Sequence, residues 1–214
     1  MGVKGPDGEP LALTAAHVVG SLSAAHGQNP TEVLLTQNVA PGSGDPRLGF
    51  VAGSHPAEPC EEVEIDASLV LLDNDVEAGN VLRETQMSGR PLDLDQIREE
   101  IPVYKRGMTT PHLTSGMLDP DVRSLKVLAP SAGCDREYVR GFFVYGADPD
   151  APFAKPGDSG AIVVDDDDRV VGMVVAVKLT NPRSRTPELD DPAFVVAMTD
   201  ILAALDFQLP GPDR

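Results

Sequence analysis

The sequence predicts an all-β protein with a short C-terminal helix, and three observations support this fold class. Apolar residues fall into short runs rich in Val and Leu. Clusters of Gly, Pro and Asp separate these runs, as is typical of strands joined by turns. Gly and Pro contribute 20 residues each to a chain of 214. Helical periodicity is clear only near the C-terminus, and no internal repeat is visible.

The expected strands follow one another along the whole chain. They are placed at residues 11–19, 32–37, 66–73, 122–129, 138–146, 161–164 and 169–179. Turn residues at 5–10 predict a hairpin at the start, and the acidic run 165–168 predicts a solvated hairpin tip. The helix is expected over 198–205, where apolar residues recur three and four apart, with Thr199 or Asp200 as its cap.

Composition limits the classes of partner and the compartment. Acidic residues outnumber basic ones 34 to 17, which gives a net charge of −17. So negative a surface repels phosphate groups, so we expect neither nucleic acid nor an anionic membrane as a partner. No apolar stretch is long enough to span a membrane, and the N-terminus does not resemble a signal peptide. The expected location is the cytoplasm.

Cysteine and histidine usage does not indicate a metal or a disulfide framework. Cys60 and Cys134 are too few for such a framework and lack metal-ligand spacing, so they are interpreted as buried or half-buried thiols. His26, His55 and His112 lie in polar or Pro-rich segments and are expected in surface loops. We therefore expect no metal and no cofactor.

Three short segments carry residues suited to nucleophilic acyl transfer. His17 closes the first long apolar run, Asp66 stands at the head of a strand, and Ser159 lies in the sequence Gly-Asp-Ser-Gly. Taken one at a time, His17 would be interpreted as a structural histidine, Asp66 as a turn residue or helix cap, and Gly-Asp-Ser-Gly as a tight turn. Together they supply a hydroxyl nucleophile, an imidazole to accept its proton and a carboxylate to orient the imidazole. Glycines beside the serine let backbone N–H groups converge on an oxyanion.

The order His, Asp, Ser is one of three convergent orders known for such triads. Residues 14–17, 66–72 and 157–160 resemble the three signature blocks of trypsin/chymotrypsin-like serine proteases. Residues 103–116 resemble the opening of the second barrel in intracellular-type microbial members. The closing strand and helix at 194–205 are similar as well, so the resemblance covers nearly the whole chain.

This resemblance implies a role for each matching residue. His17 would be the general base, Asp66 its orienting carboxylate and Ser159 the nucleophile. The N–H groups of Gly157 and Ser159 would form the oxyanion hole. The implied function is a serine endopeptidase that cleaves a peptide or protein through an acyl-enzyme.

The implied fold is a pair of perpendicular six-stranded barrels. Residues 1–100 would form the lobe that carries the base and the acid, residues 101–208 the lobe that carries the nucleophile and the helix, and 209–214 a tail. Residues 1–10 supply one strand where the family has about two before the histidine. We therefore expect an incomplete first barrel, because the start is mis-set, the chain is an excised domain, or another polypeptide completes it.

The sequence departs from secreted members of the family at two points. Val18 replaces the cysteine that follows their histidine, which fits a reducing compartment. No activation site precedes His17, so Asp158 lacks the N-terminal amine that pairs with the matching aspartate in those relatives. We expect Asp158 to have another partner or to remain a hydrogen-bonded acceptor. The site would then form without cleavage or be switched by a partner.

The substrate pocket is expected around two segments. Phe153 occupies the position six residues before the nucleophile, where no carboxylate is present to receive Lys or Arg. Val175, Ala176 and Val177 match the strand along which the substrate would add as a β-strand. Because Val177 would narrow the pocket entrance, we expect a small or medium apolar residue before the scissile bond.

Two alternatives to the endopeptidase remain open. The chain could be a catalytically silent or partner-activated protease-fold module that binds peptides or proteins. It could also be an esterase, since the same acyl chemistry cleaves esters. The α/β-hydrolase elbow is not matched, however, because Ala161 stands where that motif requires Gly.

Overall fold

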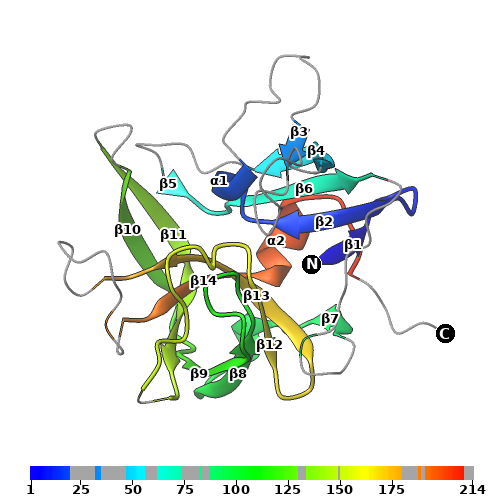
Figure 1. The fold of residues 1–214 in the computed structure, drawn as a ribbon. Coiled ribbons are helices and arrows are strands. Elements are labelled where there is room, and N and C mark those ends of the chain that lie inside the picture. The colour runs from blue at the N-terminus through cyan, green and yellow to red at the C-terminus, as the bar shows by residue number, and fades with distance from the viewer. Residues whose placement is uncertain are drawn as a thin grey trace.

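The protein is described here by a computed structural model. It describes residues 1–19, 32–34, 47–55, 62–73, 82, 87–129, 134–148, 150–179, 188 and 191–209. The strands of these segments form a five-stranded and a nine-stranded sheet, which make up two lobes one above the other (Figure 1). No helix in the described residues is both long and apolar enough to cross a membrane.

The first lobe is built on an antiparallel sheet of five strands. In spatial order these are β1 (Gly2–Lys4), β2 (Pro10–Thr14), β6 (Ala67–Leu72), β4 (Arg47–His55) and β3 (Glu32–Leu34). The predicted hairpin at the start is confirmed, since β1 pairs with β2 and the Gly8 N–H donates to the carbonyl of Gly5. The first barrel thus has five described strands where the family implied six.

The expected strand 11–19 ends early, and its last residues form a helical turn instead. Helix α1 (Ala16–Val19) begins two residues after β2 ends at Thr14. The chain turns there because the Val18 N–H donates to the carbonyl of Ala15, while the Ala16 N–H donates to the carbonyl of Asp66. His17 therefore lies on a turn anchored to the segment that precedes β6.

The second lobe contains a closed six-stranded barrel. Around the ring lie β9 (Thr114–Leu118), β8 (Ile101–Lys105), β12 (Ile162–Asp165), β13 (Arg169–Val177), β14 (Ala193–Ala197) and β11 (Cys134–Gly146), which pairs back with β9. Its interior is filled by buried apolar side chains such as Val103, Leu118, Phe142 and Val163. The acidic run 165–168 lies at the β12–β13 hairpin, as predicted, with Asp166 and Asp167 exposed at its tip. The prediction that the whole run is solvated is wrong for Asp165, which is the buried last residue of β12 and pairs with Arg169.

Three short or extended strands connect the barrel to its surroundings. β10 (Arg123–Ala129) pairs with the first half of β11, and β5 (Glu62–Val63) pairs with β11 in parallel. β7 (Ser88–Pro91) pairs in parallel with β13, and a 3-10 turn at Leu94–Gln96 follows it. In Figure 1 the β10–β11 hairpin rises from the second lobe to the level of β5 in the first.

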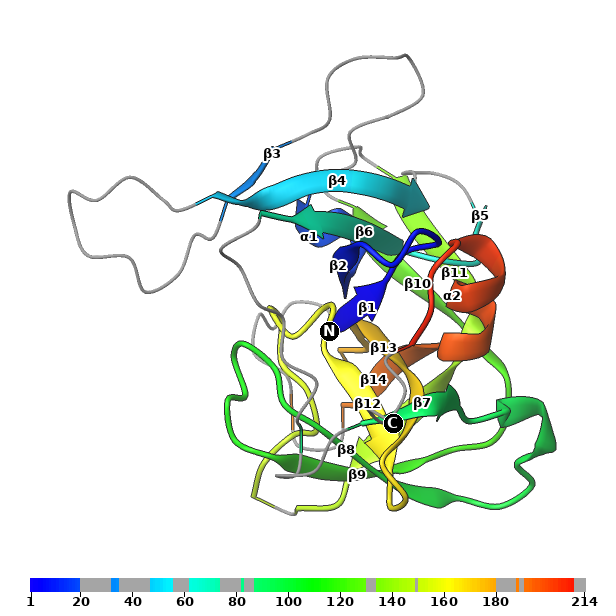
Figure 2. The same ribbon diagram turned by 90° about the vertical axis from the view of Figure 1, so that its right-hand side faces the viewer.

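The two lobes share one apolar core. The largest cluster of buried side chains joins Leu13 and Leu69 of the first sheet to Met173 and Phe194 of the second, and it includes Met198 at the start of the C-terminal helix. The shared core holds the lobes against each other, and Figure 2 shows the C-terminal helix beside both. The predicted boundary near residue 100 remains a prediction.

The C-terminal helix is confirmed, but its predicted cap is wrong. Helix α2 spans Met198–Ala204 and follows β14 directly, with Ala197 at the N-cap and no side-chain cap. Asp200 lies inside the first turn and pairs with Arg140 at 2.8 Å. Because the strand runs straight into the helix, no polar residue is available at the cap position.

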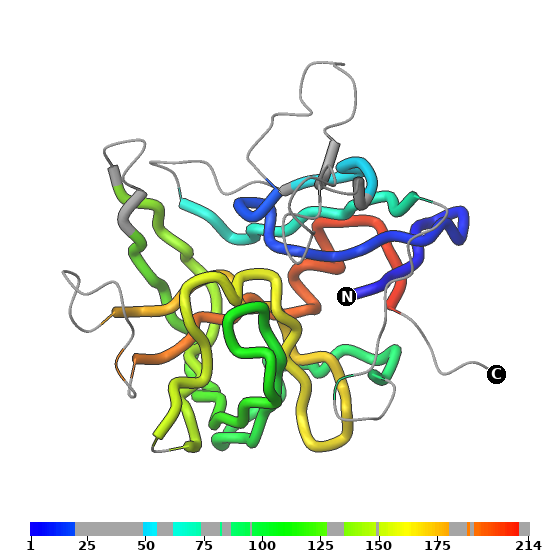
Figure 3. Tube along the Cα trace, viewed as in Figure 1, coloured from blue at the N-terminus to red at the C-terminus, as the bar shows by residue number. Residues whose placement is uncertain are grey.

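After the helix the chain returns to the N-terminal strand. The Lys4 N–H donates to the Gln208 carbonyl at 3.0 Å, and the Gln208 N–H donates to the Lys4 carbonyl at 2.7 Å. Figure 3 shows this red segment beside the blue start of the chain. The bridge pairs the last residue of β1 on the edge that faces away from β2, and an unpaired strand edge is open to other chains.

Replacing Phe194 with Ala tests the shared core. The Phe194 ring is fully buried and contacts the rings of Phe143 and Tyr138 at centroid distances of 5.4 and 5.9 Å. Loss of this ring should lower the free energy of unfolding by about 3–5 kcal/mol. Urea unfolding would measure the change, and the exposed Val122→Ala serves as a control with an effect within about 1 kcal/mol. Equal effects for the two variants would contradict a single shared core.

Candidate active site

The structure brings His17 and Asp66 into direct contact. The His17 backbone N–H donates to Asp66 Oδ1 at 3.0 Å, and the ring Nδ1 lies 2.5 Å from Asp66 Oδ2. The Asp66 side chain is fully buried, whereas that of His17 is 30% exposed. An ionised carboxylate only accepts hydrogen bonds, so Nδ1 carries the proton and Nε2 is left as the basic nitrogen.

The buried carboxylate of Asp66 stays ionised. Burial alone would raise its pKa, but the hydrogen bond and charge of His17 and the hydrogen bond from Tyr138 outweigh burial and hold the pKa below its usual value. The Tyr138 hydroxyl donates to Asp66 Oδ2 at 2.6 Å. Sequence reasoning missed Tyr138, because it lies far from the motifs in a strand that reads as ordinary core.

Ser159 lies on a loop made of two consecutive tight turns. In the first, the Asp158 N–H donates to the Lys155 carbonyl, with Pro156 and Gly157 between them. Gly157 has φ of 100°, and Pro followed by a residue of positive φ fits a type II turn, which favours glycine at the second position. The second turn runs from Asp158 to Ala161 with Gly160 at φ of 90°.

This loop packs directly against the segment that leads to His17. A Cβ atom on Gly160 would lie 2.6 Å from Thr14 Oγ1 and 3.2 Å from the Ala15 nitrogen. The contact joins the end of β2 in the first lobe to the serine loop of the second. The Ser159 hydroxyl donates to the Val175 carbonyl at 3.3 Å. Among the hydrogen bonds of the described residues, none joins Ser159 to His17.

Two backbone N–H groups of the loop have no acceptor among the hydrogen bonds of the described residues. The hydrogen bonds of the described chain use the N–H groups of Asp158, Gly160 and Ala161, but not those of Gly157 and Ser159. These two are the donors expected for an oxyanion hole. Backbone N–H groups left unpaired in a turn can receive an anionic oxygen.

Asp158 is the anchor of the serine loop. Its Oδ1 accepts from the backbone N–H groups of Thr109 and Thr110 and from the Thr109 hydroxyl, at 2.6–3.2 Å. Its Oδ2 accepts from the Lys155 N–H, the Thr110 hydroxyl and the Lys105 ammonium, at 2.7–3.0 Å. Burial would raise the pKa of Asp158, but these donors outweigh it and hold the pKa far below its usual value.

The partner of Asp158, which the sequence does not identify, is Lys105 in the structure. Its side chain is fully buried, its ammonium lies 2.9 Å from Asp158 Oδ2, and it sits over the Phe153 ring at 5.4 Å. Burial lowers the pKa of Lys105, while Asp158 counteracts the change. The loop is thus fixed by an internal cation at the end of β8. A basic residue at the end of an apolar strand is the only signal that could have indicated it.

Comparisons with known proteins place this arrangement in context. No family model and no curated protein matches the sequence. Solved structures match nearly the whole chain. A glutamic-acid-specific serine protease has a TM-score of 0.64 at 14% identity, with 98% of this chain and 90% of that chain covered. Protease A of Thermobifida fusca has a TM-score of 0.62 at 18% identity, with coverage of 99% and 89%.

A chymotrypsin of Cellulomonas bogoriensis has a TM-score of 0.59 at 17% identity, with coverage of 98% and 90%. The chain has the chymotrypsin-like serine protease fold. The predicted fold class is therefore confirmed. At these low sequence identities, the structural similarity shows the fold and not the activity.

The residues predicted to bind substrate lie in two different environments of this chymotrypsin-like fold. Phe153 is only 1% exposed and packs in the barrel core against Gly116. Val175 is buried, whereas Ala176 and Val177 are half-buried on β13. On the edge of β13 that faces β12, strand pairing ends at Met173. Two further backbone hydrogen bonds join Val174 to Gly160 and Ala161. Past Val174, no described strand covers this edge.

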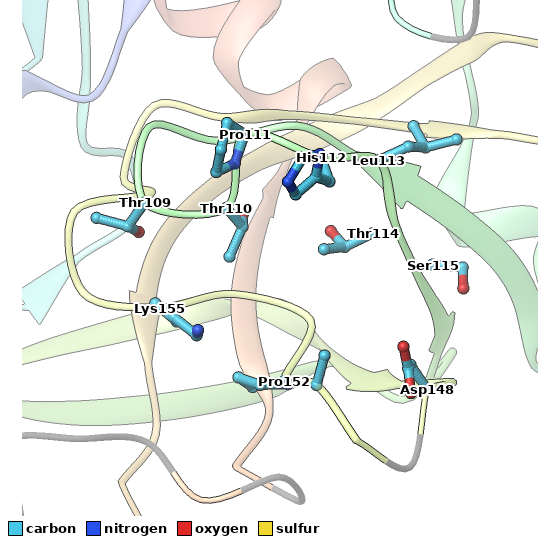
Figure 4. Close-up of a pocket in the computed structure, with 11 residues that line it drawn as sticks. Thr109, Thr110, Pro111, His112, Leu113, Thr114, Ser115, Asp148, Pro152 and Lys155 are labelled. Atoms are coloured by element: carbon cyan, nitrogen blue, oxygen red, sulfur yellow. The ribbon is translucent and has the colours of Figure 1, made fainter.

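A separate pocket of about 330 Å³ lies beside the anchor of the serine loop. Figure 4 shows Lys155 and Pro152 across from Thr109 and Thr110. His112 is exposed, as predicted, and lines the pocket. Its walls do not include any of the three residues of the predicted triad.

The described residues contain no group of three or more side chains that could hold a metal ion. Cys60 and His26 lie outside the described residues, as do the side chains of Cys134 and His55. The predictions made for these four residues therefore remain predictions.

Replacing Lys105 with Met tests the anchor. The substitution leaves the Asp158 carboxylate buried without a cation, which should lower the free energy of unfolding by about 3–5 kcal/mol. The double variant Lys105→Met with Asp158→Asn removes both charges and should recover part of the loss. Lys126→Met is the matched control, because Lys126 pairs with Glu137 at the surface and should contribute about 1 kcal/mol or less. If urea unfolding showed the same loss of free energy of unfolding for Lys105→Met and Lys126→Met, the role of Lys105 as the anchor of Asp158 would be contradicted.

Proposed function

We propose that this protein is a serine endopeptidase that uses Ser159 as nucleophile, His17 as general base and Asp66 as the orienting carboxylate. The observation that carries the proposal is the hydrogen bond between His17 Nδ1 and the fully buried Asp66. It fixes the ring so that Nε2 is the nitrogen able to take a proton. The packing of the Ser159 loop against the residues that precede His17 supports the same assignment.

The reaction begins with a rotation of the Ser159 side chain. Its hydroxyl leaves the Val175 carbonyl and donates to His17 Nε2, as catalytic hydrogen bonds often tighten only when substrate binds. Oγ then attacks the scissile carbonyl carbon while Nε2 takes the proton. The oxyanion accepts hydrogen bonds from the N–H groups of Gly157 and Ser159, each typically supplying about 3–4 kcal/mol of transition-state stabilisation.

His17 next gives the proton to the leaving amine, which breaks the peptide bond and leaves an acyl group on Ser159. A water molecule loses a proton to His17 and attacks the acyl carbon. The bond between that carbon and Ser159 Oγ then breaks, Oγ takes the proton back from His17, and the acyl group leaves as a carboxylic acid. The charge of Asp66 stabilises the imidazolium in both halves of the cycle. No cofactor takes part in this scheme.

The proposed substrate is a peptide or protein in extended conformation. The edge of β13 beyond Val174, which no described strand covers, supports strand addition along Val175–Val177. Half-buried Val177 supports a narrow entrance, so the residue before the scissile bond would be small or medium and apolar. The net charge of −17 disfavours nucleic acid and anionic membranes, and we propose action in the cytoplasm.

The Lys105–Asp158 pair supports a site that forms without cleavage of the chain. The pair supplies the buried cation from within β8, so no newly freed N-terminus is needed to hold the serine loop.

A silent or partner-activated module that binds peptides is the second candidate. The Ser159 hydroxyl bonds to Val175 and not to His17, and the described part of the first lobe has five strands. An additional segment or partner that completes this lobe would favour the second candidate.

Labelling by a fluorophosphonate probe decides between the two candidates. The wild-type protein should be labelled at Ser159, and Ser159→Ala should abolish the label while leaving the circular dichroism spectrum unchanged. Ser115→Ala, at a serine outside the site, should retain full labelling. A folded wild-type protein that the probe does not label would favour the binding module.

Profiling with a peptide library tests the substrate class. The wild-type protein should cleave after small or medium apolar residues, and Val177→Gly should improve kcat/KM for large apolar residues about tenfold or more by opening the entrance. Ala176→Gly adds the same backbone freedom at the neighbouring position and should leave the preference unchanged. Cleavage confined to Arg and Lys sites would refute the proposed specificity.

A further inference from the structure

Tyr138 makes a contact that the proposed triad does not account for. Its hydroxyl donates to Asp66 Oδ2 at 2.6 Å, the same oxygen that accepts from His17 Nδ1 at 2.5 Å. Both Tyr138 and Asp66 are almost completely buried. One carboxylate oxygen therefore receives the imidazole of one lobe and a phenol of the other.

Tyr138 is fixed both through its backbone and through its ring. The backbone of Tyr138 pairs with Leu125 of β10 on one edge of β11 and with Val63 of β5 on the other. The ring packs on Phe194 at a centroid distance of 5.9 Å. Because Val63 lies three residues before Asp66, the β5–β11 pairing sets the phenol and the carboxylate in register.

A buried tyrosine needs some acceptor for its hydroxyl, and a purely structural role is the simplest explanation. The acceptor, however, is the same Asp66 oxygen that contacts His17, which indicates a role in the candidate site. A donor on Oδ2 stops the carboxylate from turning and fixes which oxygen faces the imidazole. It also draws negative charge away from the oxygen that His17 contacts, in an interior where such effects are strong.

The phenol remains a donor under ordinary conditions. Burial and the Asp66 carboxylate raise the pKa of Tyr138, while the neighbouring Arg136 side chain acts in the opposite direction. The charged or titratable groups that face this cluster in the described residues are thus His17 from α1, Asp66, and Arg136 from β11.

We propose that Tyr138 is a positioning residue, which holds the Asp66 carboxylate in the orientation that the His17 imidazole requires and moderates its basicity. The role rests on the proposed function of the triad. It makes the second lobe, through β11, a contributor to the geometry of the base and acid in the first lobe.

Tyr138→Phe removes the hydroxyl and keeps the ring. Two readouts are measured: the rate of fluorophosphonate labelling against pH, and the NMR chemical shift of the proton on His17 Nδ1. We expect labelling at neutral pH to slow about tenfold, the size of a lost hydrogen bond to a charged group. With one donor fewer, Oδ2 accepts more strongly from the His17 Nδ1–H group, so the signal of that proton should move downfield.

Tyr145→Phe is the matched control, because Tyr145 lies on the same strand and is 41% exposed. It should change neither readout. A Tyr138→Phe protein that is folded, with both the labelling rate and the His17 Nδ1 proton signal unchanged, would overturn the proposal and leave Tyr138 as core. Substitution of tyrosine by 3-fluorotyrosine, a stronger donor of nearly equal size, should move the Nδ1 proton signal upfield and provides the test if Tyr138→Phe does not fold.

The two readouts separate this proposal from the proposed function. If the wild-type protein is not labelled at all, the endopeptidase assignment fails, yet the His17 Nδ1 proton signal still reports on Tyr138. If labelling is normal and that signal does not respond to either change at Tyr138, only the positioning role fails.

Discussion

The buried carboxylate of Asp158 is the constraint on which the serine loop depends. An ionised side chain with 1% exposure is tolerated only where donors replace its lost hydration. Those donors come from the loop itself, through the Lys155 N–H, and from the β8–β9 connection, through Lys105, Thr109 and Thr110. The hydrogen bonds to this one carboxylate therefore fix the serine loop relative to the end of β8 and the residues that follow it. The turns around Gly157 and Gly160 belong to the loop that is held in this way.

Asp66 applies the same constraint between the lobes. It is as deeply buried as Asp158, and its donors come from α1 in the first lobe and β11 in the second. In a chain of net charge −17, most carboxylates are solvated. These two are desolvated and fully hydrogen-bonded, and they flank the residues with which the proposed chemistry is carried out. Perturbed carboxylates of this kind are common at functional sites.

Local sequence was sufficient for the motifs but not for their supports. The Gly-Asp-Ser-Gly loop is contiguous, and its turn chemistry can be read directly. Lys105 lies 53 residues from Asp158, and Tyr138 lies 72 residues from Asp66, so no spacing rule connects them. Strands such as β4 and β9 were missed because Gly and Ser interrupt their apolar pattern. The turn at α1 was missed because Ala-Ala-His-Val-Val continues an apolar run, and only the contact with Asp66 bends it.

A site divided between two lobes works only if the lobes do not move apart. Catalytic geometry must be kept to within about 0.5 Å, and His17 and Ser159 come from different sheets. The shared apolar core, the β5–β11 pairing and the contact of Gly160 with Thr14 all oppose a hinge motion. What remains free is the torsion of the Ser159 side chain, whose only described hydrogen bond is a long one to the Val175 carbonyl. In the proposed reaction the Ser159 side chain has to rotate away from the Val175 carbonyl, while the contacts between the lobes oppose their separation.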